Sequence, residues 1–170
     1  MKKRILALLL ALLLLFANLG ALADVLVDGN VAITEELLVE YGFEYSSPEE
    51  VALYLHAFEE LPPNYITKAD ARALGWESSQ GNLWDVAYGA SIGGDHFGNR
   101  EGLLPDGDWY ECDVNYEGGY RGAERLLFSE DGMICYSGDH YESYELLYEF
   151  WYYEDGYYRG ISEAWGGQDD

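Results

Sequence analysis

The chain has 170 residues, with 32 acidic side chains against nine basic ones and a formal charge of −23 at pH 7. Hydrophobic residues make up 49% of the sequence and aromatic residues 16%, which excludes an acidic disordered chain and is enough for one folded domain. A surface this negative repels phosphates, so charge alone argues against a nucleic-acid partner.

Residues 1–23 have the pattern of a secretory signal. The basic start Lys2-Lys3-Arg4 precedes a leucine-rich run, which ends in the small-residue motif Ala21-Leu22-Ala23. The run is shorter than the about 20 apolar residues of a spanning helix, so cleavage is favoured over a retained membrane anchor. Cleavage removes three of the nine basic residues and no acidic one, which leaves a charge of −26. The sequence therefore predicts a secreted, extracellular protein without membrane contact.

The segment before residue 90 has the signals of helices. Residues 24–45 have mixed periodicity and predict a loosely attached N-terminal extension. The motif Ser47-Pro48-Glu49-Glu50 is a capping box, which predicts the start of a helix that ends at Leu61-Pro62-Pro63. Two shorter helices are expected, with their caps at Thr67 and Asn82 and their ends near Leu74 and Ala87.

After residue 90 apolar and polar residues alternate between Gly and Asp punctuation, which indicates antiparallel strands. Strands are expected near residues 91–96, 109–115, 124–129, 133–137 and 143–148. Asp131-Gly132 predicts a tight hairpin between the third and fourth of these. The order of elements predicts an α+β domain over residues 46–148, with N-terminal helices packed on one face of a roughly five-stranded antiparallel sheet. The C-terminal extension, residues 149–170, predicts a further hairpin at Asp155-Gly156 and an acidic tail.

The alternation places several charged residues on one open, polar face of the sheet. Glu111 and Asp113 share a face of the second strand, Arg125 is on the polar side of the third, and Arg121 lies in the turn between them. Asp139-His140 follows the fourth strand. Such groups suit phosphodiester cleavage, because a carboxylate accepts a proton, an imidazolium donates one, and guanidiniums hold the phosphate. Spacing alone leaves open the alternative of a surface ladder of Glu–Arg pairs.

Lys68 lies in the first turn of the second predicted helix, where the helix dipole disfavours a cation. This unfavourable position suggests another use, such as a phosphate bound at the helix end.

For the two cysteines, alternation turns Cys112 toward the core and Cys135 the opposite way. We therefore expect free thiols, although two cysteines in a secreted chain favour a disulfide.

Residues 54–148 resemble the barnase-like family of secreted, guanyl-preferring bacterial ribonucleases. The resemblance is carried in chain order by YLHAFEELPPNYITKADARALGW, GNLWDVAYGASIGGDHFGNREGLLP, ECDVNYEGGYRGAER and DHY. It implies an endoribonuclease that cleaves single-stranded RNA 3′ of guanosine by transesterification to a 2′,3′-cyclic phosphate, which is later hydrolysed. No metal or organic cofactor is implied, since the ribose 2′-hydroxyl is the nucleophile.

The resemblance also assigns roles to residues. It implies Glu111 as the general base and His140 as the general acid, with Lys68, Arg121 and Arg125 as phosphate-binding cations. The guanine-reading loop would be Phe97, Gly98, Asn99, Arg100 and Glu101, in which Glu101 accepts from the base, and Tyr141 and Phe97 would pack near the nucleotide. Asp113 would order the two arginines, with Asp139 as a second supporting residue. The implied partners of the monomer are RNA and a barstar-like protein inhibitor.

Three departures from the family stand out. Leu103 replaces a usual cation, Gly98 replaces a commoner serine in the reading loop, and the two extensions have no counterpart. Only six basic residues remain after residue 23, and four of them match active-site positions of the family, namely Lys68, Arg100, Arg121 and Arg125. This pattern favours retained catalysis and accounts for the few arginines beside carboxylates.

Two other hypotheses remain from the sequence. One is a catalytically weak or inactive secreted module that binds RNA or nucleotides, or attaches to a surface. The other is a carbohydrate-active protein with paired carboxylates and tryptophans, which leaves Arg121, Arg125 and His140 without a role.

Overall fold

The computed structural model describes residues 25–34, 36–100, 102–148, 152–154 and 157–159. The predicted secretory signal and the predicted acidic tail lie outside the described residues. Within those ranges, every helix is too short or too polar to cross a membrane.

The N-terminal extension forms a small antiparallel sheet in the order β1-β2-β3. Its strands are β1 (Leu26–Asp28), β2 (Val31–Ile33) and β3 (Leu38–Glu40). Ala32 and Val39 are fully buried against Leu53 and Tyr54 of the first long helix. The expectation of a loosely attached segment is therefore wrong, because these strands bury their apolar side chains on the helix.

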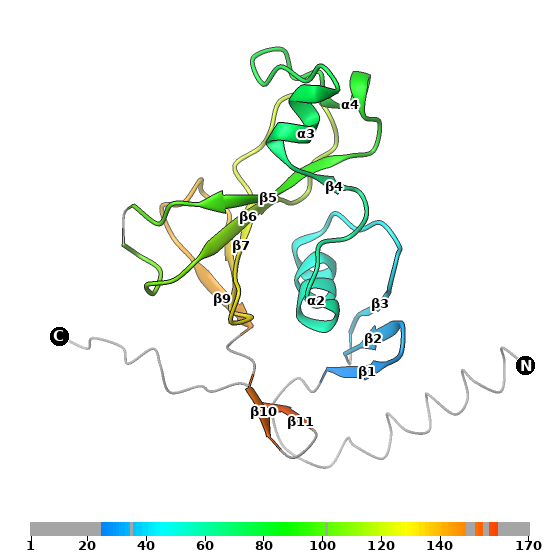
Figure 1. Cartoon of the computed structure of the whole chain (residues 1–170), viewed down its shortest axis with the longest axis vertical. Helices are drawn as coiled ribbons and strands as arrows, with labels where there is room; N and C mark the ends of the chain where they lie inside the picture. Colours follow the sequence, from blue (N-terminus) through cyan, green and yellow to red (C-terminus); the bar gives the residue numbers. More distant parts are fainter. Residues whose placement is uncertain (1–24, 35, 101, 149–151, 155–156, 160–170) are drawn as a thin grey trace, which may run out of the picture.

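That helix, α2 (Pro48–Phe58), starts as its capping sequence predicts. The Ser47 hydroxyl accepts from the Glu50 N–H at 3.3 Å and donates to the Glu50 carboxylate at 2.7 Å. The helix ends at Phe58, three residues before the predicted end at Leu61-Pro62-Pro63, because its C-cap residue Glu59 adopts a left-handed conformation with φ of 59°. Its apolar stripe packs on one face of the main sheet, where Val51 and Leu55 lie in one buried cluster with Leu126 (Figure 1).

The main sheet has six strands in the order β4-β5-β6-β7-β8-β9. They are β4 (Tyr65–Ile66), β5 (Ser91–Phe97), β6 (Trp109–Asp113), β7 (Arg125–Ser129), β8 (Ile134–Ser137) and β9 (Glu145–Tyr148). The five predicted antiparallel strands are confirmed, and so is the turn at Asp131-Gly132, where Gly132 has φ of 90°. The two-residue β4, which pairs parallel to β5, has too few residues to give an alternation signal.

Two short helices, α3 (Lys68–Ala73) and α4 (Leu83–Val86), lie beside the β4–β5 end of the sheet (Figure 1). Thr67 caps α3 as predicted, because its hydroxyl accepts from the Asp70 N–H at 3.1 Å. Asn82 is the N-cap residue of α4 as predicted, but its side chain makes no capping hydrogen bond to the helix. That amide instead accepts from the Glu77 N–H at 2.8 Å and donates to the Gly75 carbonyl at 3.1 Å, so it closes the loop before α4.

The two cysteines lie in different hydrophobic clusters, and both are free thiols as expected. Cys112 belongs to the cluster under α2, whereas Cys135 packs with Leu104, Trp109 and Leu127 on the other face. The expectation that Cys135 faces away from a core is wrong, since the segment after β5 folds back and covers this face with Leu104.

At the C-terminal end, β10 (Tyr152–Glu154) pairs antiparallel with β11 (Tyr157–Arg159), as the predicted hairpin requires.

Candidate active site

Five charged side chains from four parts of the chain meet on the face of the main sheet opposite α2. Together they form what we call the ion-pair cluster, which contains Lys68 from the start of α3, Glu111 and Asp113 from β6, Arg121 from the turn after β6, and Arg125 from the start of β7. Glu111, Asp113 and Arg125 are 6%, 1% and 3% exposed. The face is therefore polar as predicted but closed at these residues, and each buried charge requires a partner.

Glu111 is held at both carboxylate oxygens. Lys68 Nζ forms an ion pair with Oε1, and the Tyr141 hydroxyl donates to Oε2. Burial favours the neutral acid, but hydrogen bonds from Lys68 and Tyr141 and the charges of Lys68 and Arg121 outweigh it and keep the pKa of Glu111 below its ordinary value. Glu111 is thus ionised at neutral pH and can accept a proton.

Asp113 holds the two arginines in a fixed arrangement. Arg121 makes a two-pronged contact, with its Nε 2.6 Å from Oδ2 and its Nη2 2.6 Å from Oδ1. Arg125 Nε lies 3.0 Å from Oδ1. Bidentate guanidinium–carboxylate pairs restrict both distance and plane, so Asp113 sets the direction in which the arginines present their remaining donors.

Arg125 links the pair of Asp113 and Arg121 to the pair of Glu111 and Lys68. Its Nε also lies 3.2 Å from the Tyr141 hydroxyl, which in turn bonds to Glu111. Its Nη1 donates to the carbonyls of Gly122 at 2.9 Å and Glu124 at 2.7 Å. Within the cluster three cations meet two carboxylates, which leaves one positive charge for an anion such as a phosphodiester.

Sequence reasoning missed Asp95, which fixes the start of α3. Its Oδ2 accepts from the backbone N–H of Lys68 at 2.8 Å. That N–H is therefore not free to bind a phosphate at the start of α3, which the position of Lys68 had suggested. The register of β5 shifts between Gly93 and Asp95, and Gly94 has φ of 87°. Such a bulge re-aims the next side chain. The paired glycines before Asp95 were the available signal.

The side chain of Asp139 fixes the loop after β8 through hydrogen bonds. Asp139 Oδ1 accepts from the Ser137 hydroxyl and from the backbone N–H groups of Glu142 and Ser143, each at 3.0 Å, and Oδ2 accepts from the Ser143 hydroxyl at 2.5 Å. These bonds, the Ser143 hydroxyl first, lower the pKa of Asp139 to about 2. Ser137, which sequence reasoning also missed, accepts from the Tyr141 N–H at 2.9 Å.

This loop presents His140 and Tyr141 in an unusual backbone conformation. Their φ angles are 63° and 74°, a left-handed region that non-glycine residues rarely adopt. His140 is exposed, and its ring centroid lies 5.1 Å from that of Tyr141. The imidazole of His140 therefore lies beside the ring of Tyr141, whose hydroxyl contacts Glu111.

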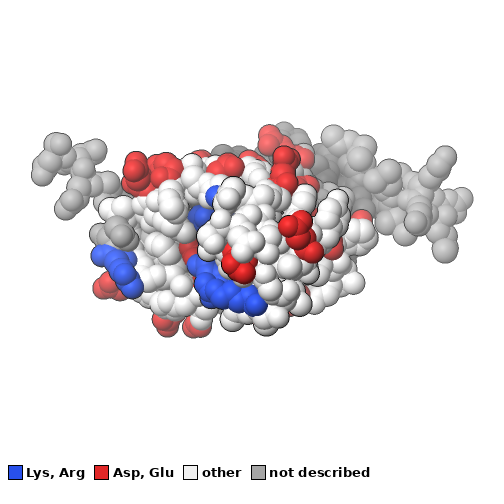
Figure 2. Space-filling model, turned by 90° about the horizontal axis from the view of Figure 1, so that it is seen from above, with Lys and Arg blue, Asp and Glu red and all other residues white. Residues whose placement is uncertain are grey.

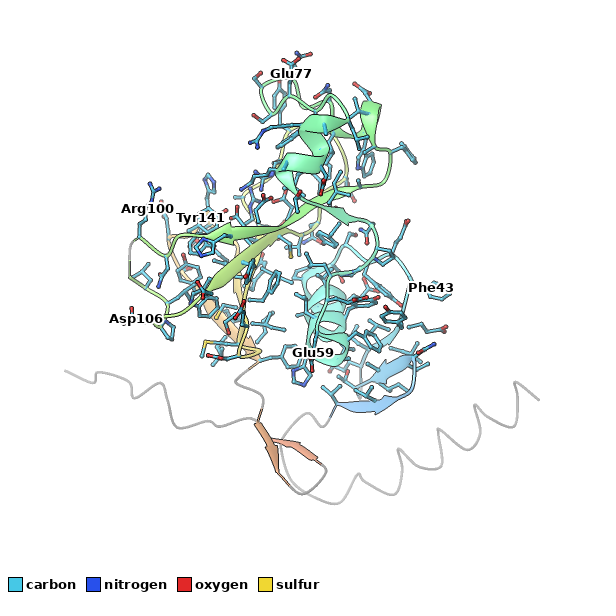
Figure 3. The ribbon with its side chains drawn as sticks, in the orientation of Figure 1. Phe43, Glu59, Glu77, Arg100, Asp106 and Tyr141 are labelled. Atoms are coloured by element: carbon cyan, nitrogen blue, oxygen red, sulfur yellow. The ribbon has the colours of Figure 1, made fainter. Side chains whose placement is uncertain are left out.

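The residues of the expected reading loop have different positions. The Phe97 ring lies 5.1 Å from the Tyr141 ring, which brings the loop to the ion-pair cluster. Asn99 donates to the Leu104 carbonyl at 2.8 Å and accepts from its N–H at 3.2 Å, so its amide closes the loop. Arg100 is exposed and extends from the loop on the side where Tyr141 lies (Figure 3). Glu101 lies outside the described residues.

In Figure 2, Lys and Arg side chains lie in the middle of the face and at its left edge, with Asp and Glu side chains around and between them. Across the described residues, His, Cys, Asp and Glu side chains form no group of three that could hold a metal ion. The chemistry that the described groups themselves offer is proton transfer at Glu111 and binding of an anion by fixed cations.

An α+β fold in which a carboxylate lies beside fixed guanidiniums suits a protein that binds phosphates, and comparisons with known proteins identify the family. The family model described as ribonuclease matches residues 49–148. A ribonuclease of Heyndrickxia coagulans is 53% identical over 100 residues, which are 57% of this chain and 92% of that protein. A Bacillus intermedius ribonuclease is 53% identical over 100 residues, 57% of this chain and 62% of that protein.

A guanyl-specific ribonuclease St of Saccharopolyspora erythraea is 44% identical over 54 residues, which cover 29% of this chain and 54% of that protein. The chain belongs to the ribonuclease family, in its barnase-like microbial branch, and is an RNA-cleaving enzyme. The matched range includes the whole ion-pair cluster but neither the N-terminal sheet nor the β10–β11 pair.

Proposed function

We propose that this protein is a secreted endoribonuclease that cleaves single-stranded RNA, preferentially 3′ of guanosine, by transesterification. The observation that carries the proposal is the position of the ionised Glu111 carboxylate, which contacts Lys68 and Tyr141 beside two arginines fixed on Asp113. This set provides a proton acceptor and a cationic site for one phosphodiester within a single cluster.

In the first step Glu111 accepts the proton of the ribose 2′-hydroxyl, and the oxygen attacks the adjacent phosphorus. Negative charge builds on the non-bridging oxygens, where Lys68, Arg121 and Arg125 stabilise it. His140 donates a proton to the departing 5′-oxygen, so the bond to the next nucleotide breaks and a 2′,3′-cyclic phosphate remains. In the second step the two residues exchange roles, and water opens the cyclic phosphate.

Guanine preference is supported by the loop that starts at Phe97 and by the name of the Saccharopolyspora relative. We propose that Asn99 acts by holding this loop closed, that Arg100 lies over the bound nucleotide, and that Glu101 accepts from the guanine edge. Gly98, where the family commonly has serine, would set how strong this preference is.

The decisive experiment is digestion of the dinucleotides GpU, ApU, CpU and UpU by the purified protein, with the products identified by mass. We expect GpU to be cleaved fastest, through a 2′,3′-cyclic guanosine phosphate, and the variants Glu111→Ala and His140→Ala to be inactive. Equal rates for all four dinucleotides would contradict the guanine preference. Binding of RNA without any cleavage would favour the inactive binding module instead.

Secretion is proposed from residues 1–23 and is tested by the N-terminal sequence of protein recovered from the culture medium, expected to begin near Asp24. A barstar-like inhibitor is a further proposed partner of the monomer. If that inhibitor is acidic, the two negative surfaces repel, and association should be slow.

A further inference from the structure

A groove lies between the end of α2 and the main sheet, on the face of the sheet opposite the ion-pair cluster. Its volume is about 460 Å³, and its walls are largely apolar. Leu55 and Leu61 line it from α2 and the segment that follows, and Phe128 and Ile134 line it from β7 and β8. Concave sites of about 300–1,000 Å³ with apolar walls and a few polar groups are typical of ligand binding. The groove is therefore large enough to receive an apolar side chain of a partner.

The backbone of the sheet keeps side chains out of this groove at two positions. Gly94 and Gly132 line it, and their φ angles of 87° and 90° lie in the left-handed region that favours glycine. Gly94 belongs to the bulge before Asp95, and Gly132 closes the turn between β7 and β8. A larger residue at either position would strain the backbone, so the fold itself leaves the groove open.

The rim of the groove is negatively charged. Glu130 accepts from the Tyr110 hydroxyl at 3.1 Å, whereas the exposed Glu59 carboxylate forms no ion pair or side-chain hydrogen bond with the described residues. Glu59 directly follows the C-terminal end of α2, where the helix dipole also favours a cation. Among the described residues, no Lys or Arg lines the groove. The groove thus complements a ligand that carries a positive charge beside an apolar group.

We propose that this groove binds a basic protein partner through one aromatic side chain flanked by Lys or Arg. The aromatic ring would fill the groove, and the neighbouring cation would pair with Glu59. The charge of −23 on the chain favours the approach of a basic partner over an acidic one. In Figure 3 Glu59 lies at the end of α2, away from Tyr141, whose hydroxyl contacts Glu111. Binding therefore leaves the ion-pair cluster open, and the inference does not depend on the proposed ribonuclease function.

The test uses the capped tripeptides Lys-Trp-Lys, Lys-Gly-Lys and Gln-Trp-Gln as probes. Each is titrated into the isotope-labelled protein, and the backbone N–H signals of Gly94 and Gly132 in NMR spectra report on the groove. We expect Lys-Trp-Lys to shift both signals with a Kd of about 1 mM. Lys-Gly-Lys, which lacks the ring, should bind at least about tenfold more weakly, and Gln-Trp-Gln, which lacks the charges, about two- to fivefold more weakly. The signal of Gly122, beside the ion-pair cluster, should not move.

Two neighbouring glutamates separate a specific contact from general attraction. Glu59→Gln should weaken the binding of Lys-Trp-Lys by about two- to fivefold and leave that of Gln-Trp-Gln unchanged, because only the ion pair is lost. The matched control is Glu60→Gln, which removes the same charge from an exposed residue that does not line the groove. Its Kd for Lys-Trp-Lys should equal that of the wild type.

Three outcomes would overturn the proposal. In the first, Lys-Trp-Lys leaves the signals of Gly94 and Gly132 unmoved, or Glu60→Gln weakens its binding as much as Glu59→Gln. In the second, Gln-Trp-Gln binds as tightly as Lys-Trp-Lys, so that the ligand needs no charge. In the third, the groove signals shift with protein concentration alone, which would identify the occupant as a second copy of this chain.

Discussion

The ion-pair cluster and the surface around it are built from opposite charges, and they act over different distances. In the cluster, cations lie in direct contact with buried carboxylates, as in the pair of Arg121 and Asp113 at 2.6 Å. Outside the cluster acidic residues dominate, since the whole chain has 32 acidic residues against nine basic ones and the cluster contains two of the former and three of the latter. Buried contacts are little screened by salt, whereas exposed charges lose most of their influence beyond a Debye length. Changes in the cluster should therefore be large and independent of salt, and changes on the surface small and dependent on it.

The largest effect is expected from Glu111→Gln. The substitution keeps the shape of the side chain but removes its proton acceptor, so kcat on GpU should fall by about 10²- to 10⁴-fold. Glu130→Gln, at an exposed glutamate that contacts Tyr110, is the matched control and should retain wild-type kcat. A loss of less than about tenfold in Glu111→Gln would assign the general base elsewhere.

Asp113→Asn should have the largest effect on stability. It leaves Arg125, only 3% exposed, without its carboxylate, and an unpaired buried charge costs about 3–5 kcal/mol. Urea unfolding of the variant measures this directly. Asp108→Asn provides the comparison, because Asp108 is exposed and its contact with His96 is 3.6 Å long, so its free energy of unfolding should change by at most about 0.5 kcal/mol. Similar values for both variants would show that the buried ion pairs add little to stability.

Asp139→Asn should weaken the loop that carries His140. The hydrogen bonds to Asp139 maintain left-handed φ angles at His140 and Tyr141, and a small displacement of a catalytic group costs up to about 100-fold in rate. We expect kcat to fall by about 10- to 100-fold with a smaller change in KM. A change in KM alone would contradict a positioning role.

The depressed pKa of Asp139 gives the same loop a pH dependence. The ordinary pKa is 3.8 and the folded-state value about 2, so the contribution to stability is complete above about pH 4 and is lost as pH falls through about 2. Acid unfolding of the wild type should therefore include this loss, and Asp139→Asn should lack it. Identical acid-unfolding profiles would show that the loop contributes no such term.

Salt should produce the smallest effect. Cleavage of long RNA should rise a few-fold between about 10 and 100 mM salt, over which the Debye length falls from about 30 to 10 Å and repulsion by the acidic surface weakens. GpU cleavage, which depends on the ion-pair cluster, should change less over this range. A steep decrease for long RNA from the lowest salt upward would indicate attraction instead.

Much of the fold could be predicted because its signals are local. Ser47 and Thr67 have side chains that cap their own helices, and Asp131-Gly132 forms a turn within four residues. The N-terminal sheet could not be predicted in this way, because three-residue strands show no periodicity and depend on burial against α2. Burial of Cys135 also depends on a segment distant in sequence, which supplies Leu104.

The site shows the same division. Glu111, Asp113 and Arg125 were expected on one face because strand alternation is a local rule, and the structure places them there. The role of Asp95 depends on a bulge in β5, and that of Ser137 on the shape of a loop. Residue spacing determines neither contact, so neither could be predicted from the sequence.

The two cysteines lie in different buried clusters, so their reactivity reports on the unfolding of two separate parts of the domain. Burial raises the pKa of both thiols, that of Cys135 to about 12, so neither reacts with an alkylating reagent until its own surroundings are exposed. Pulsed alkylation followed by peptide mass mapping would therefore time the release of α2, which exposes Cys112, separately from the opening of the cluster around Leu104, which exposes Cys135. The native sequence thus allows the two halves of the enzyme to be followed during unfolding without engineered labels.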